Sequence, residues 1–187
     1  MKKYLFLLFC SLLTQANATV NMRDVLKSMP DSIIPLLAEN NRLDFIDFME
    51  SDMKAEVTNV LQGKSSMTEL DDHYTKILLT ESSVVEMILL ETQTPVDSVN
   101  QVLCVVKTFG TDIKESTVDF YSVKGRRLKT VDYMVCPNAD MWVATWNKHD
   151  AVMTITPVSH LNPPADEEQK TIEKPSTNLK WDGLILK

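Results

Sequence analysis

The stretch Tyr74-Thr-Lys-Ile-Leu-Leu-Thr80, Glu81-Ser-Ser83, Val84-Val-Glu-Met-Ile-Leu-Leu90 decides the fold class. Its two halves are rich in β-branched and large apolar residues, and the short polar segment between them is typical of a turn. The pattern predicts a β-hairpin over residues 74–90. Residues 99–108 are apolar at nearly every position, which indicates a central strand with both faces covered.

More strands are expected on the C-terminal side of this hairpin. Residues 117–123 alternate between apolar and polar side chains, and residues 141–146 and 151–156 flank a short polar turn. We therefore expect an antiparallel β-meander over residues 66–156.

The last part of the chain contains a change in composition. Residues 157–178 are rich in Pro, Glu, Lys, Ser and Thr, which favours a solvated linker. Residues 179–186 are expected to return as a terminal strand that joins either edge of the sheet.

The segment before the strands, residues 19–63, shows helical periodicity. Asn40 or Asn41 is suited to cap a helix that ends at Gly63. Apolar residues recur along it at spacings of three and four: Leu43, Ile46, Met49, Met53, Val57 and Val60. This pattern predicts a long amphipathic helix packed on the sheet, and thus an α+β fold with N-terminal helices followed by the meander.

The N-terminus has the pattern of a secretory signal peptide. Lys2 and Lys3 precede an apolar run over residues 4–13, and Ala16-Asn17-Ala18 matches a cleavage site. The run is too short to span a bilayer, which takes about 20 residues. We expect cleavage after Ala18, export to the periplasm or cell exterior, and a single mature domain over residues 19–187.

Composition excludes several classes of function. A net charge of −7 has the wrong sign for a nucleic-acid-binding protein. Only four Gly and three His are present. The composition therefore disfavours Gly-rich phosphate-binding loops and metal sites built from His. We expect no nucleic-acid partner, no metal, no cofactor and no membrane span in the mature chain.

Two clusters carry weak catalytic or metal-binding signals. Asp71-Asp72-His73 offers oxygen and imidazole ligands for a metal, but the segment also fits a solvated turn at the start of a strand. His149-Asp150 offers half of a Ser-His-Asp relay, although no G-x-S-x-G elbow accompanies it. In both cases the pattern favours the turn.

The tryptophans and cysteines leave alternatives open. Trp142 and Trp146 have the same parity and should face the same side of one strand, as core residues or as a platform for a ligand or partner. After signal cleavage, Cys104 and Cys136 remain, either paired as a disulfide or with Cys104 as a buried free thiol.

The segment Ser28-Met-Pro-Asp-Ser-Ile-Ile-Pro-Leu-Leu37, followed by Asn40-Asn-Arg-Leu-Asp-Phe-Ile-Asp-Phe48, resembles a family of small secreted proteins of unknown function from Bacteroidales-type bacteria. The resemblance continues through Asn59 and Gly63-Lys-Ser-Ser-Met67 and covers most of the mature chain. It implies a Gram-negative envelope and supplies no catalytic residues. We expect a non-enzymatic module that binds an envelope protein or a small ligand; the alternative is a small periplasmic hydrolase that uses carboxylates or His149.

Overall fold

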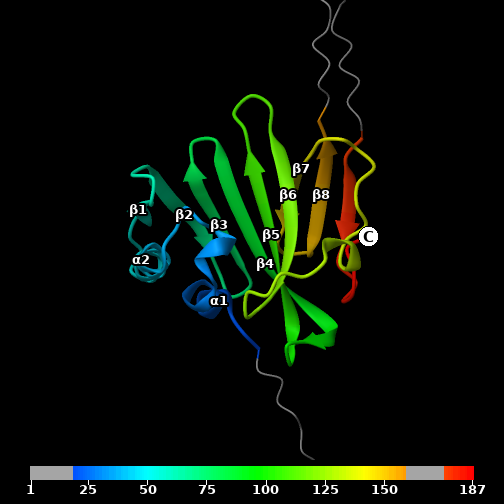
Figure 1. Ribbon diagram of the computed structural model, residues 1–187, viewed down its shortest axis with the longest axis horizontal. Helices are drawn as coiled ribbons and strands as arrows, with labels where there is room; N and C mark the ends of the chain where they lie inside the picture. The colour runs from blue at the N-terminus through cyan, green and yellow to red at the C-terminus, as the bar shows by residue number, and fades with distance from the viewer. Residues whose placement is uncertain (1–18, 159–174) are drawn as a thin grey trace, which may run out of the picture.

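The computed structural model describes residues 19–158 and 175–187. Its main layer is a six-stranded antiparallel sheet in which neighbouring strands are also consecutive in the chain (Figure 1). The strands are β1 (Glu56–Thr58), β2 (Lys64–Leu70), β3 (Tyr74–Thr80), β4 (Ser83–Val96), β5 (Val99–Phe109) and β6 (Glu115–Ser122). The hairpin predicted over residues 74–90 is β3–β4, and β5 pairs with a neighbour on each side.

A second, three-stranded antiparallel sheet is formed by β7 (Trp142–Asn147), β8 (Val152–Pro157) and β9 (Thr177–Lys180). The single meander expected over residues 66–156 is thus divided between two sheets. The terminal strand is shorter than expected, and it joins the edge of β8. The expected signal peptide and residues 159–174 of the expected linker lie outside the described residues.

The helices are short. They are α1 (Met22–Ser28), α2 (Glu39–Glu50) and two 3₁₀ turns, η1 (Asp31–Ile33) and η2 (Thr130–Asp132). The α2 helix packs against α1, β1 and β2, and Figure 1 shows both α-helices toward the β1 end of the large sheet. No helix in the described ranges has the length and apolar character needed to cross a membrane.

The prediction of one long helix up to Gly63 is wrong, because α2 ends at Glu50. Asp52 adopts a left-handed conformation with φ of 53°. The Asp52 N–H donates to the Met49 carbonyl at 3.4 Å, and the Met53 N–H donates to the Phe48 carbonyl at 2.9 Å. This is a Schellman motif, which terminates a helix. Residues 57 and 60, which continued the apolar period, lie on β1 and in the following turn.

One buried arginine joins the helices. The side chain of Arg42, in α2, is 2% exposed. Its guanidinium donates to the carbonyl oxygens of Leu26 (2.8 Å), Met29 (2.9 Å) and Leu37 (2.9 Å) and to Asp31 Oδ1 (2.6 Å). The Leu26 carbonyl lies in the last turn of α1, where residue 30 is a proline without an N–H, so the arginine replaces a missing helical donor.

The large sheet separates two apolar cores. Met87 of β4 and Leu103 of β5 face the helices, whereas Ile88 and Cys104, one residue further along each strand, face the three-stranded sheet. This arrangement explains why β5 is apolar on both faces, as the sequence predicted.

Neither outer layer covers the whole sheet. The three-stranded sheet packs behind β4–β6, and its core cluster reaches only Tyr74 at the start of β3. The face of β1–β3 opposite the helices is consequently open; we call it the open half. There Leu78 is 37% exposed and Thr68 is exposed.

Candidate functional site

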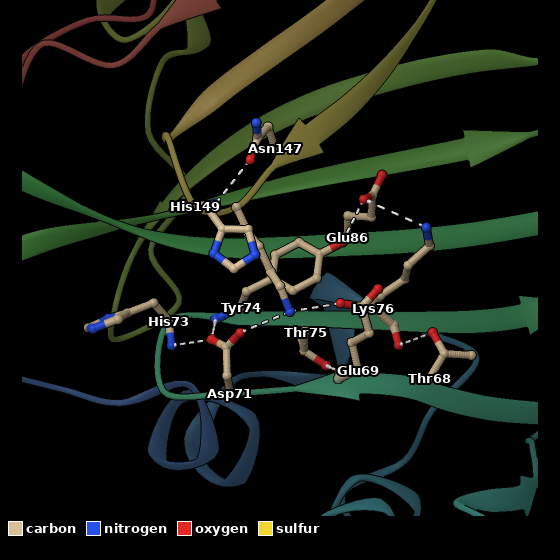
Figure 2. A network of polar contacts seen from close by, with 11 residues as sticks. Thr68, Glu69, Asp71, His73, Tyr74, Thr75, Lys76, Glu86, Asn147 and His149 are labelled. Atoms are coloured by element: carbon tan, nitrogen blue, oxygen red, sulfur yellow. Dashed lines mark hydrogen bonds and ion pairs between the residues drawn. The ribbon is translucent and has the colours of Figure 1, made fainter.

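A row of alternating charges crosses the large sheet at the boundary between the open half and the covered half. Glu69 of β2 is paired in register with Lys76 of β3, and Lys76 is paired with Glu86 of β4. Directly opposed residues of neighbouring strands share a face, so the three side chains form a Glu–Lys–Glu row. Figure 2 shows this row with the polar side chains around it. We call Glu69, Lys76 and Glu86 the charged row.

Lys148 connects the second sheet to this row. It lies in the turn between β7 and β8, and its Nζ is 2.8 Å from Glu69 Oε2 and 3.3 Å from Asp71 Oδ2. The same ammonium lies 5.2 Å from the centre of the Tyr74 ring. The hydrogen bond with Glu69 is the main reason that the pKa of Lys148 is raised. The lysine therefore stays charged and anchors the β7–β8 turn to β2 and β3.

The buried end of the row is Glu86, whose side chain is 7% exposed. Its Oε1 accepts a hydrogen bond from the Tyr74 hydroxyl at 2.6 Å, and Lys76 Nζ lies 4.0 Å from the same oxygen. Burial, followed by the hydrogen bond to Glu86, raises the pKa of Tyr74 well above its ordinary value. Tyr74 is thus a fixed hydrogen-bond donor to a buried carboxylate rather than a base.

Asp71 organises the turn that leads into β3. Its Oδ1 accepts from the backbone N–H groups of His73 (2.9 Å) and Tyr74 (2.8 Å), as the dashed lines of Figure 2 show for His73. Burial alone would raise the pKa of Asp71, but these hydrogen bonds and the neighbouring Lys148 outweigh burial and lower it. The carboxylate remains ionised and holds the turn in place.

A depression on the open half begins beyond the charged row. It is open to solvent, and its walls come from β1, β2, β3 and the β3–β4 turn. The lining residues are Glu56, Lys64, Ser65, Ser66, Leu78, Thr80 and Glu81. Lys64 and Glu56 form an ion pair across β1 and β2, so the lining of the depression combines a charged pair with an exposed leucine.

The segment Asp71-Asp72-His73 forms the turn favoured by the sequence rather than a ligand cluster. Asp71 accepts from the backbone N–H groups of His73 and Tyr74, whereas Asp72 accepts from Arg23 at 2.9 Å on the helix side. His73 is exposed. Within residues 19–158 and 175–187, no three His, Cys, Asp or Glu side chains are grouped so that they could hold a metal ion.

His149 and Asp150 also form a turn. Asp150 accepts from the Asn147 side-chain amide at 2.8 Å, and Asn147 Oδ1 accepts from the His149 backbone N–H at 3.1 Å. The aspartate is engaged with the asparagine and not with the imidazole. The structure therefore brings these residues together for turn formation, without the His–Asp hydrogen bond that a catalytic relay requires.

Trp142 and Trp146 face the same side of β7, as their parity predicted, and that side is the core between the two sheets. Trp146 is 9% exposed, and Trp142 is partly buried against the same core. Trp181, just after β9, also packs there, where it stacks on Phe120 with ring centres 6.5 Å apart. Of the two alternatives left open by the sequence, the geometry is that of core packing.

Cys104 and Cys136 are both free thiols in the structure. Cys104 is buried on β5 between the sheets, and Cys136 is exposed in the segment before β7. Burial raises the pKa of the Cys104 thiol. The structure thus has the buried thiol and not the disulfide between Cys104 and Cys136.

The charged row and Lys148 were not found as a site from the sequence. Glu69, Lys76, Glu86 and Lys148 come from three strands and a distant turn, so no local motif marks them. One indirect signal was present in the sequence. Glu86 is a charged residue within the apolar segment 84–90, and a buried charge needs a hydrogen-bonding or charged partner.

Comparison with known proteins identifies the family. The model of a family described as "Protein of unknown function (DUF3256)" matches residues 14–178. The chain belongs to the DUF3256 family. This confirms the resemblance to an uncharacterised family that residues 28–48 carry. No curated protein matches this DUF3256 chain.

A solved structure shares the DUF3256 chain's fold. It is a domain of an uncharacterized protein from Porphyromonas gingivalis W83, with a TM-score of 0.65 and 16% sequence identity. The similarity covers 88% of this chain and 96% of that one. At this identity the likeness establishes the fold and not an activity.

The residues that carried the family resemblance have structural roles in this fold. Arg42 joins the helices. Asn59 holds the turn between β1 and β2: its Oδ1 accepts from the N–H groups of Leu61 and Gly63, both at 3.0 Å, and its Nδ2 donates to Ser65 Oγ at 3.0 Å. Arg42 thus holds the helices of this DUF3256 fold together, and Asn59 holds the turn between β1 and β2.

Proposed function

We propose that this DUF3256 protein is a non-enzymatic binding module of the Gram-negative envelope, and that it holds a protein partner against the open half of its sheet. The observation that carries this proposal is the incomplete coverage of the sheet: the three-stranded layer stops at the charged row and leaves β1–β3 exposed on one face. A sheet face that is half covered within the chain presents a surface of fixed shape to a partner.

The chemistry of the site favours binding over catalysis. The carboxylates of the site are engaged: Glu69 and Asp71 pair with Lys148, and Glu86 accepts from Tyr74. A hydrolase needs an acid and a base that are free to exchange protons with the substrate. The alternative of a periplasmic hydrolase gains no support from these contacts or from the engaged turn of His149.

The shape of the open half favours a macromolecule over a small ligand. Sites for small molecules are concave and bury most of the ligand surface. The depression near Leu78 is open to solvent, with Ser66, Thr80 and the ion pair of Glu56 and Lys64 in its lining. An exposed apolar residue with a polar border is an arrangement found in protein–protein interfaces.

Site-specific photocrosslinking tests this proposal. A photoreactive residue at position 78 is compared with one at position 145, an exposed position of β7 on the other sheet, in cells that express the full chain at its natural level. The expected result is one discrete covalent adduct of polypeptide mass from position 78 and none from position 145. Equal adducts from both positions, or no adduct from position 78, would overturn the proposal.

Native mass spectrometry of the protein purified from its own envelope fraction distinguishes the kind of partner. An added polypeptide mass that disappears in Leu78→Glu supports a protein partner. An added mass of small-molecule size would overturn the commitment to a protein.

The location in the envelope is a separate part of the proposal and rests on the signal pattern of residues 1–18. We expect the mature chain to begin at Thr19. N-terminal sequencing of the protein from fractionated cells checks this; an intact Met1 on cytoplasmic protein would contradict it.

A further inference from the structure

The helix side of the large sheet also has an uncovered part, at the end of β5 and β6 away from the helices (Figure 1). Lys107 of β5 is paired with Thr117 of β6, and Val105 is paired with Asp119. Alternate residues of β6 share a face, so Asp119 and Tyr121 lie on the same side as Lys107. This face is distinct from the open half, which lies on the opposite side of the sheet.

Arg127 approaches this group from beyond the edge of β6. Its backbone forms an antiparallel bridge with Tyr121, and its Nη2 donates to Asp119 Oδ1 at 2.5 Å. The Arg127 side chain is 71% exposed, so its other N–H donors are accessible. The preceding residue behaves differently, because Arg126 pairs with Asp97 through two of its nitrogen atoms.

Lys107 is a half-buried cation whose ammonium has no ion pair or hydrogen bond with any residue in the described ranges. Burial lowers its pKa; Asp119 acts in the opposite direction, and Arg127 adds to the lowering. Since Asp119 is neutralised by Arg127, the group as a whole has an excess positive charge. An unpaired half-buried charge is unfavourable, and an anion beside it would remove that cost.

Tyr121 completes the group. It is 8% exposed, and burial followed by the charge of Asp119 raises the pKa of its hydroxyl. No residue in the described ranges forms a hydrogen bond with this hydroxyl, so it is available as a donor to a ligand. Two cations and a phenol thus lie on one face of β5 and β6, with Tyr121 at the border of the helix-side core, in a protein with a net charge of −7.

We propose that Lys107, Tyr121 and Arg127 form a binding site for one anionic group, a carboxylate or a phosphate. The guanidinium offers planar donors suited to either oxyanion, and the ammonium supplies the charge that Asp119 does not neutralise. The site lies on the other face of the sheet from the open half, so it goes beyond the proposed partner binding and does not depend on it.

The test is an NMR titration of residues 19–187 with inorganic phosphate and, separately, with acetate, at constant ionic strength maintained with chloride. The expected result is saturable chemical-shift changes of the backbone amides of Lys107, Thr117 and Arg127. The anion that gives saturation at the lower concentration is the preferred oxyanion. Lys107→Met should weaken binding about tenfold or more, because a charge-assisted contact is lost. The matched control, Lys180→Met on exposed β9, should change binding less than about twofold.

Two further variants separate binding from folding. Lys107→Arg keeps the charge and should retain binding, whereas Arg127→Gln should weaken it while Asp119 remains in place. Shifts that do not saturate, or binding that is equal in Lys107→Met and the parent chain, would overturn the site. Equal weakening by Lys107→Met and Lys180→Met would also overturn it, since that pattern reflects only the net charge of the protein.

Discussion

Replacing Arg42 with methionine should strongly destabilise the protein. The substitution keeps an unbranched side chain of similar length but removes every donor. The carbonyl oxygens of Leu26, Met29 and Leu37 would then be left without the arginine, and Asp31 would lose its partner at 2.6 Å.

The magnitude follows from these contacts. Hydrogen bonds to a charged group contribute roughly 1.5–3 kcal/mol each, and burial of the methionine offsets part of the loss. A buried acceptor left without a donor costs about 1–3 kcal/mol, and three carbonyl oxygens lose theirs, so after that offset we expect a loss of about 3–5 kcal/mol. For a domain of this size, 1 kcal/mol corresponds to about 2–4 °C, so we expect Tm to fall by roughly 6–20 °C.

The assay is thermal and urea unfolding of residues 19–187, followed by circular dichroism. The matched control is Arg23→Met, because Arg23 makes ion pairs with Glu50 and Asp72 at the surface. Surface pairs contribute about 0–1 kcal/mol, so this variant should remain close to the parent chain. If Arg42→Met lowered Tm no more than Arg23→Met, the role assigned to the buried guanidinium would be refuted.

Three other predictions address the turn, the acid range and the charged row. Asn59→Ala should lower the free energy of unfolding by about 2–3 kcal/mol in urea titrations, because buried partners lose their hydrogen bonds, whereas Gln62→Ala in the same turn should change it little. The two lysines that pair with Glu56 lower its pKa from 4.5 to about 2. A depressed pKa in the folded state adds stability above pH 4.5 that is lost as the pH falls toward 2. Glu56→Gln should therefore flatten stability against pH in that range, and an unchanged profile in low salt would contradict the assignment. Tyr74→Phe should cost about 1.5–3 kcal/mol at neutral pH, measured by urea unfolding, because Glu86 remains buried without its donor; an equal stability of the variant and the parent chain would argue against that bond.

The sequence predicted the parts of the fold that depend on local pattern. The alternation of residues 117–123 and the apolar run of residues 99–108 are properties of single strands, and both strands are present as β6 and β5. The shared face of Trp142 and Trp146 was predicted for the same reason. Whether that face is buried or exposed depends on how the two sheets stack, and a local sequence pattern does not carry this information.

The helix after Asn40 shows how a local pattern can mislead. The apolar spacing of three and four residues continued to Val57 by coincidence. Val57 is apolar because it faces the core from a strand, and its position in the sequence happens to match the spacing of the helix before it. The stop signal was Asp52 in a left-handed conformation, where glycine is the usual marker. Pairing of β1 with β2 then decided the conformation of the residues beyond it.

The candidate site could not be predicted because its members meet only through register and docking. Glu69 and Glu86 flank Lys76 only once three strands are aligned, and Lys148 arrives from a turn of the other sheet. A charged residue within an apolar strand segment was the single local indication.

The hairpin of β4 and β5 contributes side chains to both apolar cores, and this has a consequence for how the molecule unfolds. Because alternate residues of these strands belong to different cores, losing either outer layer exposes apolar side chains of the same hairpin. The helices and the three-stranded sheet are therefore linked as one cooperative unit, although they do not share a face. The amides of β5 should exchange with solvent only through global unfolding, and a shortened chain that ends before β7 should lack a stable native state.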